Sequence, residues 1–206
     1  MKALIIVDVQ NDFCPGGALP VPDGDRVVEI INRIQPRFDL VVATQDWHPA
    51  AHGSFAANHP GRKPGEQIEL GGLPQILWPV HCVQGTPGAE LHAALNRSRI
   101  ARVFHKGSDA GVDSYSGFFD NGRRWSTGLS EYLKGQGVTE VYVCGLATDY
   151  CVKFTALDAV GLGVKTYLIE DACRGVELRE GDIRQAVQQM REQGVTVIQA
   201  KELRGA

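Results

Sequence analysis

The sequence has no excess of positive charge. Its 206 residues include 21 Lys and Arg against 24 Asp and Glu, for a formal net charge of −3. Because nucleic-acid binders use cationic groups to neutralise phosphates, we expect no nucleic-acid partner. The apolar runs are short, whereas a membrane span needs roughly 20 apolar residues. No leader with a small-residue cleavage site follows Lys2, so we expect no membrane association and a cytoplasmic location.

Paired cysteines are missing as well. The five cysteines are an odd number and include no Cys-x-x-Cys motif. A chain of this length buries roughly 70% of its unfolded surface without covalent staples, so we expect no disulfide framework. The glycine-rich segment after the first apolar run, Cys14–Gly17, is not a dinucleotide-binding fingerprint, and no phosphate-binding loop occurs. Each cysteine is therefore a packing residue, a ligand or a nucleophile.

What is present is an alternation of strand-like and helix-like segments. Six short apolar runs are typical of strands, over residues 3–9, 40–44, 101–105, 138–144, 165–169 and 195–199. Four stretches have helical spacing, over residues 25–34, 126–135, 148–160 and 179–193. This alternation indicates βαβ units and a mostly parallel sheet, with strands buried on both faces. We expect one α/β domain over residues 1–206.

One long segment interrupts the alternation. Residues 45–96 contain no clear strand, much of the proline and glycine, and five of the six histidines. A loop of this length inside a compact domain is usually functional. We expect the region of about 45–100 to be a metal-binding loop.

Reactive side chains follow four of the predicted strands. Asp8 ends the first, Asp46 and His48 follow the second, Lys106 follows the third, and Cys151 comes soon after the fourth. Ligands of open α/β sheets bind at the carboxyl ends of the strands. We therefore expect these side chains to form one catalytic centre.

Cys151 is the expected nucleophile. Thr148 would cap the following helix, which places the thiol in the first turn, where the helix dipole favours a thiolate. Asp8 would accept its proton and Lys106 would tune the pair. The alternatives are an inert buried thiol, which suits Cys144 better, and an Asp8–Lys106 ion pair that only organises structure.

A metal site is the second expectation. Asp46, His48 and His81 would form a centre of two histidines and one carboxylate with open positions. The alternatives are a surface hydrogen bond for His48 and a capping role for Asp46. His52 and His59 are further candidates that we set aside.

Aromatic residues lie near these motifs in the sequence. Phe13, Trp78 and Tyr115 would suit a flat ring substrate close to a thiol and a metal. Trp47 is interpreted as an ordinary loop anchor.

Together these motifs resemble the nicotinamidase (pyrazinamidase) branch of the isochorismatase-like cysteine hydrolases. The matching segments, in order along the chain, are 8–13 (DVQNDF), 46–55 (DWHPAAHGSF), 78–86 (WPVHCVQGT), 106–107 (KG), 115–118 (YSGF) and 145–151 (GLATDYC). The first, the Lys106 segment and the last mark the superfamily. The Asp-x-His and Trp-Pro-x-His-Cys segments are more specific to nicotinamidases.

The resemblance implies a fold and an activity. The fold would be a three-layer, doubly wound, six-stranded sheet with helices on both faces. The activity would be deamidation of nicotinamide, and of pyrazinamide, to the acid and ammonia through a thioester on Cys151, in NAD salvage. Backbone N–H groups of Ala147 and Cys151 would form the oxyanion hole beside a cis Leu146–Ala147 bond. The resemblance also leaves room for a homo-oligomer.

The same resemblance implies a divalent metal ion on Asp46, His48 and His81 that binds the pyridine nitrogen. Zinc is the expected ion, with iron and manganese as alternatives. The coordination number, and any part of Ser54, His52 or His59 in it, is open.

Two rival functions stay open from the sequence. Another cysteine hydrolase of this superfamily, acting on a carbamoyl or ureido compound, would keep Asp8, Lys106 and Cys151 without needing the Asp-x-His pair. A catalytically inactive small-molecule-binding homologue would be expected to lose one of the three, and none is missing.

Overall fold

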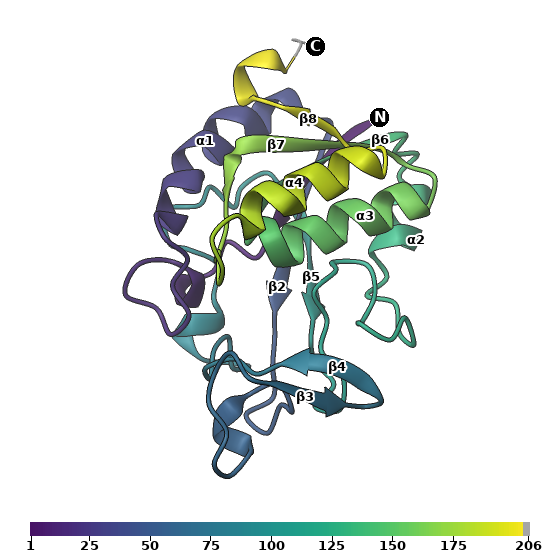
Figure 1. Ribbon diagram of the computed structural model, residues 1–206. Coiled ribbons are helices and arrows are strands. Elements are labelled where there is room, and N and C mark those ends of the chain that lie inside the picture. The colour runs from purple at the N-terminus through teal and green to yellow at the C-terminus, as the bar shows by residue number, and fades with distance from the viewer. Residues whose placement is uncertain (204–206) are drawn as a thin grey trace.

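A six-stranded sheet forms the centre of the computed structural model, which describes residues 1–203 (Figure 1). The strand order is β5-β2-β1-β6-β7-β8, and every neighbouring pair is parallel. The strands are β1 Lys2–Val7, β2 Leu40–Asp46, β5 Ile100–Lys106, β6 Glu140–Leu146, β7 Lys165–Arg174 and β8 Thr196–Ile198. The predicted α/β class and parallel sheet are confirmed. Residues 204–206 of the predicted domain lie outside the described residues.

The central strands form because they are apolar on both faces. In β1 every residue from Ala3 to Val7 is fully buried, and all of β2 is buried. Such runs cannot expose one face to water, so helices must cover both sides of the sheet.

The helices cover the sheet in two layers. They are α1 Val27–Ile34, α2 Leu129–Gly135, α3 Lys153–Gly161 and α4 Asp182–Glu192. The β1-to-β2 and β6-to-β7 connections run in opposite directions across the sheet, so right-handed crossovers place α1 on one face and α3 on the other. Figure 1 shows α3 and α4 side by side in front of the sheet.

The region expected to lack strands contains a hairpin, so that prediction was wrong. Strands β3 Gln67–Leu70 and β4 Leu73–Ile76 pair antiparallel through Gly71 and Gly72, whose φ angles are 59° and 83°. Both angles lie where glycine is favoured, and Gly-Gly between two short runs is a hairpin signal. The hydrophobic pattern of the sequence does not reveal these two strands, because they are short and weakly apolar. The hairpin lies beyond the ends of β2 and β5 (Figure 1).

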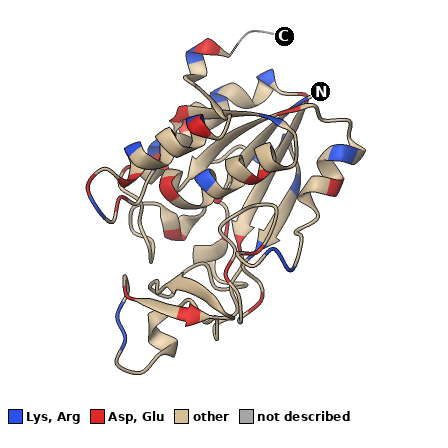
Figure 2. Ribbon diagram, turned by 45° about the vertical axis from the view of Figure 1, so that its right-hand side comes forward, with Lys and Arg blue, Asp and Glu red and all other residues tan. Residues whose placement is uncertain are grey.

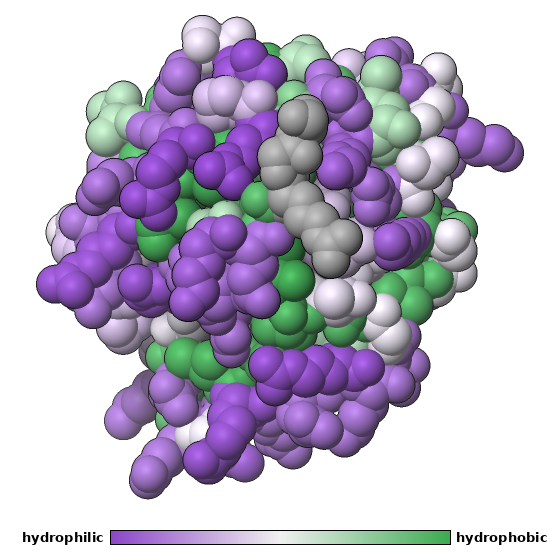
Figure 3. Space-filling model, turned by 90° about the horizontal axis from the view of Figure 1, so that it is seen from above, coloured by the Kyte–Doolittle hydropathy of each residue, from purple (hydrophilic) through white to green (hydrophobic). Residues whose placement is uncertain are grey.

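The surface is mixed in charge. Figure 2 shows Lys and Arg interspersed with Asp and Glu over the helices. The end of the molecule that carries the chain termini, seen from above, is largely hydrophilic (Figure 3). Within residues 1–203 every helix is too short or too polar to cross a membrane.

Candidate active site

Three predicted residues meet at the carboxyl edge of the sheet. Lys106, the last residue of β5, places its Nζ 2.8 Å from Asp8 Oδ2 and 3.3 Å from Cys151 Sγ. Asp8 follows β1 directly, and all three residues are buried. The arrangement brings a thiol, a carboxylate and an ammonium group into contact.

The hydrogen bonds of Lys106 leave one acceptor free. Its ammonium group donates to a carboxylate oxygen of Asp46, to Ser114 O at 2.9 Å and to Cys151 Sγ, which uses its three protons. Asp8 Oδ1 accepts from Thr44 Oγ1 at 2.6 Å, whereas Asp8 Oδ2 has an ion-pair contact but no hydrogen-bond donor among the described residues. An atom of Asp8 lies within 4.8 Å of Cys151 Sγ. This carboxylate can accept the thiol proton.

Burial and mutual charges set the pKa values of these three groups. Burial raises the pKa of Cys151 well above its usual value, although Lys106 opposes the shift. Burial thus favours the thiol over the thiolate, and Asp8 would take the proton. Burial also raises the pKa of Asp8 to about 6, and Lys106 opposes this shift too. Burial would lower the pKa of Lys106, but Asp46 and Asp8 raise it, so the amine stays charged.

The backbone around Cys151 also differs from the expectation. Residues Thr148–Val152 form a turn of π-helix before α3, with Ala147 rather than Thr148 as the N-cap. Cys151 still lies in the first turn. The Leu146–Ala147 peptide bond is cis, as the resemblance implied. Gly145 precedes it at φ 115°, where a Cβ atom would lie 2.1 Å from Val7 O.

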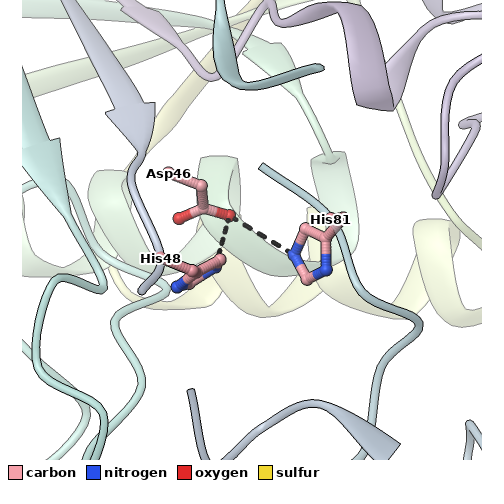
Figure 4. Close-up of side chains that lie close together, drawn as sticks. All are labelled: Asp46, His48 and His81. Atoms are coloured by element: carbon pink, nitrogen blue, oxygen red, sulfur yellow. Dashed lines mark ion pairs between the residues drawn. The ribbon is translucent and has the colours of Figure 1, made fainter. Parts of the chain in front are cut away.

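The three predicted metal ligands converge on one point (Figure 4). Asp46 Oδ2 lies 3.5 Å from His48 Nε2 and 3.8 Å from His81 Nε2. The other ring nitrogens bond to backbone carbonyls, His48 Nδ1 to Gly107 O and His81 Nδ1 to Pro79 O, each at 2.8 Å. Carbonyl oxygens only accept, so each Nδ1 carries a proton and each Nε2 faces Asp46. Burial would lower the pKa of His48, but the charge of Asp46 and a hydrogen bond to it raise that pKa.

Such a set of donors is suited to a cation. Burial and then His48 lower the pKa of His81 to about 4, so His81 is neutral near pH 7. Burial would raise the pKa of Asp46, but Lys106 and His48 lower it, so the carboxylate is ionised. A positive charge beside the Asp46 carboxylate stabilises it, whether that charge is on His48 or on a bound cation. Two imidazoles and one carboxylate with open positions suit zinc, iron or manganese.

The remaining histidines of the loop are bonded elsewhere. His52 Nδ1 bonds to Ser54 Oγ at 2.7 Å, and His59 Nε2 bonds to Gly53 O at 2.7 Å. His48, His52 and Asp113 form a second close group. His48 Nδ1 is bonded to Gly107 O, so His48 Nε2 is the one nitrogen of this ring that either group could use.

A small pocket connects the thiol to the metal ligands. Its free volume is about 30 Å³, above the roughly 10–15 Å³ that one water molecule needs. Phe13, Trp78 and Tyr115 line the pocket, where the sequence placed them. Trp47 stacks on His105 at a centroid distance of 4.5 Å and is absent from the lining.

Four further lining residues were missed: Leu19, Asp113, Tyr150 and Val176. Tyr150 precedes Cys151, and Val176 follows β7, whose end at Arg174 lies beyond the predicted 165–169. Applying the strand-end rule to the full strand would have found Val176. Leu19 and Asp113 lie in irregular segments and gave no local signal.

The family follows from comparison with known proteins. Residues 2–202 match the isochorismatase domain. The chain belongs to the isochorismatase family. It also belongs to the nicotinamidase branch of that family, because it is 53% identical to a nicotinamidase of Escherichia coli over 95% of this chain and 93% of the relative.

Similar solved structures support the assignment of this chain to the nicotinamidase branch. A nicotinamidase/pyrazinamidase of Acinetobacter baumannii superposes with a TM-score of 0.95 at 52% identity, over 98% of both chains. A pyrazinamidase of Pyrococcus horikoshii in complex with zinc superposes with a TM-score of 0.78 at 39% identity, over 96% of this chain and 98% of the other. The family and the three-layer fold implied by the resemblance are thus confirmed.

Proposed function

We propose that this protein is a metal-dependent nicotinamidase that converts nicotinamide to nicotinate and ammonia, in NAD salvage. One observation carries the proposal: Cys151, which Lys106 contacts, lines the same aromatic pocket as Asp46, His48 and His81. The relatives named nicotinamidase support the same substrate, and pyrazinamide, with a similar ring, is a second expected substrate.

The first half of the reaction forms a thioester. Asp8 takes the proton of the Cys151 thiol, and the sulfur attacks the carboxamide carbon. Backbone N–H groups of Ala147 and Cys151 stabilise the oxyanion, and Lys106 offsets the negative charge near Asp8. The proton on Asp8 passes to the leaving nitrogen, the C–N bond breaks, and ammonia departs.

The second half releases the acid. Asp8, again a carboxylate, takes a proton from water, whose oxygen attacks the thioester carbon. The C–S bond breaks, Cys151 regains a proton, and nicotinate is formed. One amide and one water thus give one acid and one ammonia.

The remaining residues position the ring. Phe13, Trp78 and Tyr115 pack against its faces and edges. A divalent cation held by Asp46, His48 and His81 would bind the pyridine nitrogen, and zinc is favoured because the Pyrococcus relative contains it. Fixing the ring at its nitrogen orients the carboxamide toward Cys151.

The test is ammonia release from nicotinamide by purified protein, with and without a chelator. We expect turnover that the chelator removes and added zinc, iron or manganese restores. Turnover of a ureido compound with none on nicotinamide would instead favour the rival cysteine hydrolase. A complete lack of turnover with metal bound would favour a binding homologue.

A further inference from the structure

Gln10 holds the backbone of one proposed metal ligand. Its Oε1 accepts the Asp46 N–H at 2.8 Å, and its Nε2 donates to Asp46 O at 2.9 Å and to Ala89 O at 2.7 Å. Gln10 is fully buried, and both of its amide N–H groups and its oxygen are used. The side chain thus hydrogen-bonds to both backbone polar groups of Asp46, as a neighbouring strand would.

Asp12 holds the backbone beside another proposed ligand. Its Oδ2 accepts the Cys82 N–H at 2.7 Å, and its Oδ1 accepts the Ala18 N–H at 3.1 Å. Cys82 directly follows His81 and has a φ of 45°, a left-handed conformation that a non-glycine residue adopts only when its surroundings hold it. Gly88 leaves the space that the Asp12 carboxylate occupies, since a Cβ atom there would lie 2.2 Å from Oδ2.

These bonds connect the two ligand-bearing segments to one short stretch of chain. Cys82 O in turn accepts the His48 N–H at 3.0 Å, so the three ligand segments are mutually fixed. Asn11, which lies between Gln10 and Asp12, donates instead to Pro87 O at 2.7 Å.

We propose that Gln10 and Asp12 are positioning residues for the metal site, with Gln10 fixing Asp46 and Asp12 fixing His81 through Cys82. The inference rests on the metal site of the proposed function and deepens it. Groups that support ligands typically change metal affinity 10–100-fold when altered.

The experiment measures metal affinity directly. Asp12→Asn keeps the shape but turns an N–H₂ group toward a backbone N–H, and Gln10→Met keeps the length but removes every hydrogen bond. Asn11→Ala is the matched control.

Each purified protein is stripped of metal with a chelator. It is then titrated with Co²⁺, followed by visible absorption, and with Zn²⁺ in competition with a coloured chelator. Thermal unfolding confirms that each variant is folded, and Gln10→Glu, which keeps the acceptor for Asp46, replaces Gln10→Met if that variant does not fold.

We expect the Kd for both ions to rise about 10–100-fold in the Gln10 and Asp12 variants and to stay within about twofold in Asn11→Ala. The Co²⁺ spectrum of Asp12→Asn should change, because His81 is displaced, while the iodoacetamide alkylation rate of Cys151 stays that of the wild type. Wild-type affinity in the folded variants, or an equal loss in Asn11→Ala, would overturn this proposal alone. A wild-type protein that binds neither ion would overturn the metal site as well.

Discussion

Cys151 and Cys144 are both buried thiols, but their surroundings differ. Cys151 contacts the Lys106 ammonium group, whereas Cys144 Sγ is 3.7 Å from Ile5 O, within the sheet. We expect Cys151→Ala to lower the turnover of nicotinamide by about three orders of magnitude or more with the fold intact. Cys144→Ala should lower stability by about 1 kcal/mol and keep most of the activity. Ammonia release and thermal unfolding measure both effects, and the reverse pattern would mean that the nucleophile is misassigned.

The Asp8 carboxylate predicts an acid limit to activity. Burial raises the pKa of Asp8 to about 6, so its basic form is lost as the pH falls through that value. We expect kcat/KM to be constant near neutrality and to fall about tenfold per pH unit below pH 6. The measurement is kcat/KM from pH 4.5 to 8, with the bound metal determined at each pH to exclude metal loss. Undiminished activity at pH 4.5 would rule out Asp8 as the proton acceptor.

At the scale of elements, the β3–β4 hairpin supports one wall of the pocket. Gln75 of β4 donates to Asp113 Oδ2 at 2.9 Å and to Tyr115 Oη at 3.2 Å, and Trp78 Nε1 donates to the same hydroxyl at 3.2 Å. The hairpin therefore fixes Tyr115 and Trp78, which the proposed function places against the ring.

Gln75→Leu, which keeps the size but not the hydrogen bonds, should raise KM for nicotinamide several-fold and change kcat less. The physical reason is that Tyr115 loses a donor that fixes its position, while the thiol site is untouched. Steady-state kinetics measure KM and kcat separately. Gln67→Leu, the same change at an exposed position of β3, is the control and should leave KM unaltered. A loss confined to kcat would contradict a role in holding the ring.

At the scale of the whole molecule, the two halves of the site predict separable functions. Metal removal should abolish nicotinamide hydrolysis, because the ring loses its anchor. The alkylation rate of Cys151 by iodoacetamide should stay the same, because Asp8 and Lys106 reach the thiol without the metal. Benzamide, which has no ring nitrogen, should be a poor substrate with or without metal. Mass spectrometry measures the alkylation rate of Cys151 in the metal-bound and the metal-free protein. A much slower alkylation in the metal-free protein would mean that the metal also activates the thiol.

Metal binding should also stabilise the folded chain as a whole. A ligand that binds only the folded state at 100 times its Kd adds about 2.7 kcal/mol. We expect the Tm to rise by several degrees when zinc is added to stripped protein. Asp46→Ala should remove this rise, and a rise that persists in Asp46→Ala would place the ion elsewhere.

The sequence determined the elements and the kinds of residue at the site. Apolar runs such as Ala3–Val7, which is buried on both faces, suit the central strands of a parallel sheet. Asp8, Lys106 and Cys151 follow such strands, so their convergence could be predicted from parallel topology alone. The Gln67–Ile76 hairpin was the exception, because its strands are too short and polar for periodicity to reveal.

Protonation states and supporting hydrogen bonds depend on the packed molecule. Whether Cys151 is a thiol or a thiolate depends on the balance between burial and Lys106, and burial is a property of the packed molecule. The local sequence does not indicate that Gln10 hydrogen-bonds to Asp46, 36 residues away, or that Asp12 hydrogen-bonds to Cys82, 70 residues away. Residue type and strand position can be predicted from short stretches of sequence. Shifted pKa values and long-range hydrogen bonds arise only when segments far apart in the sequence pack together.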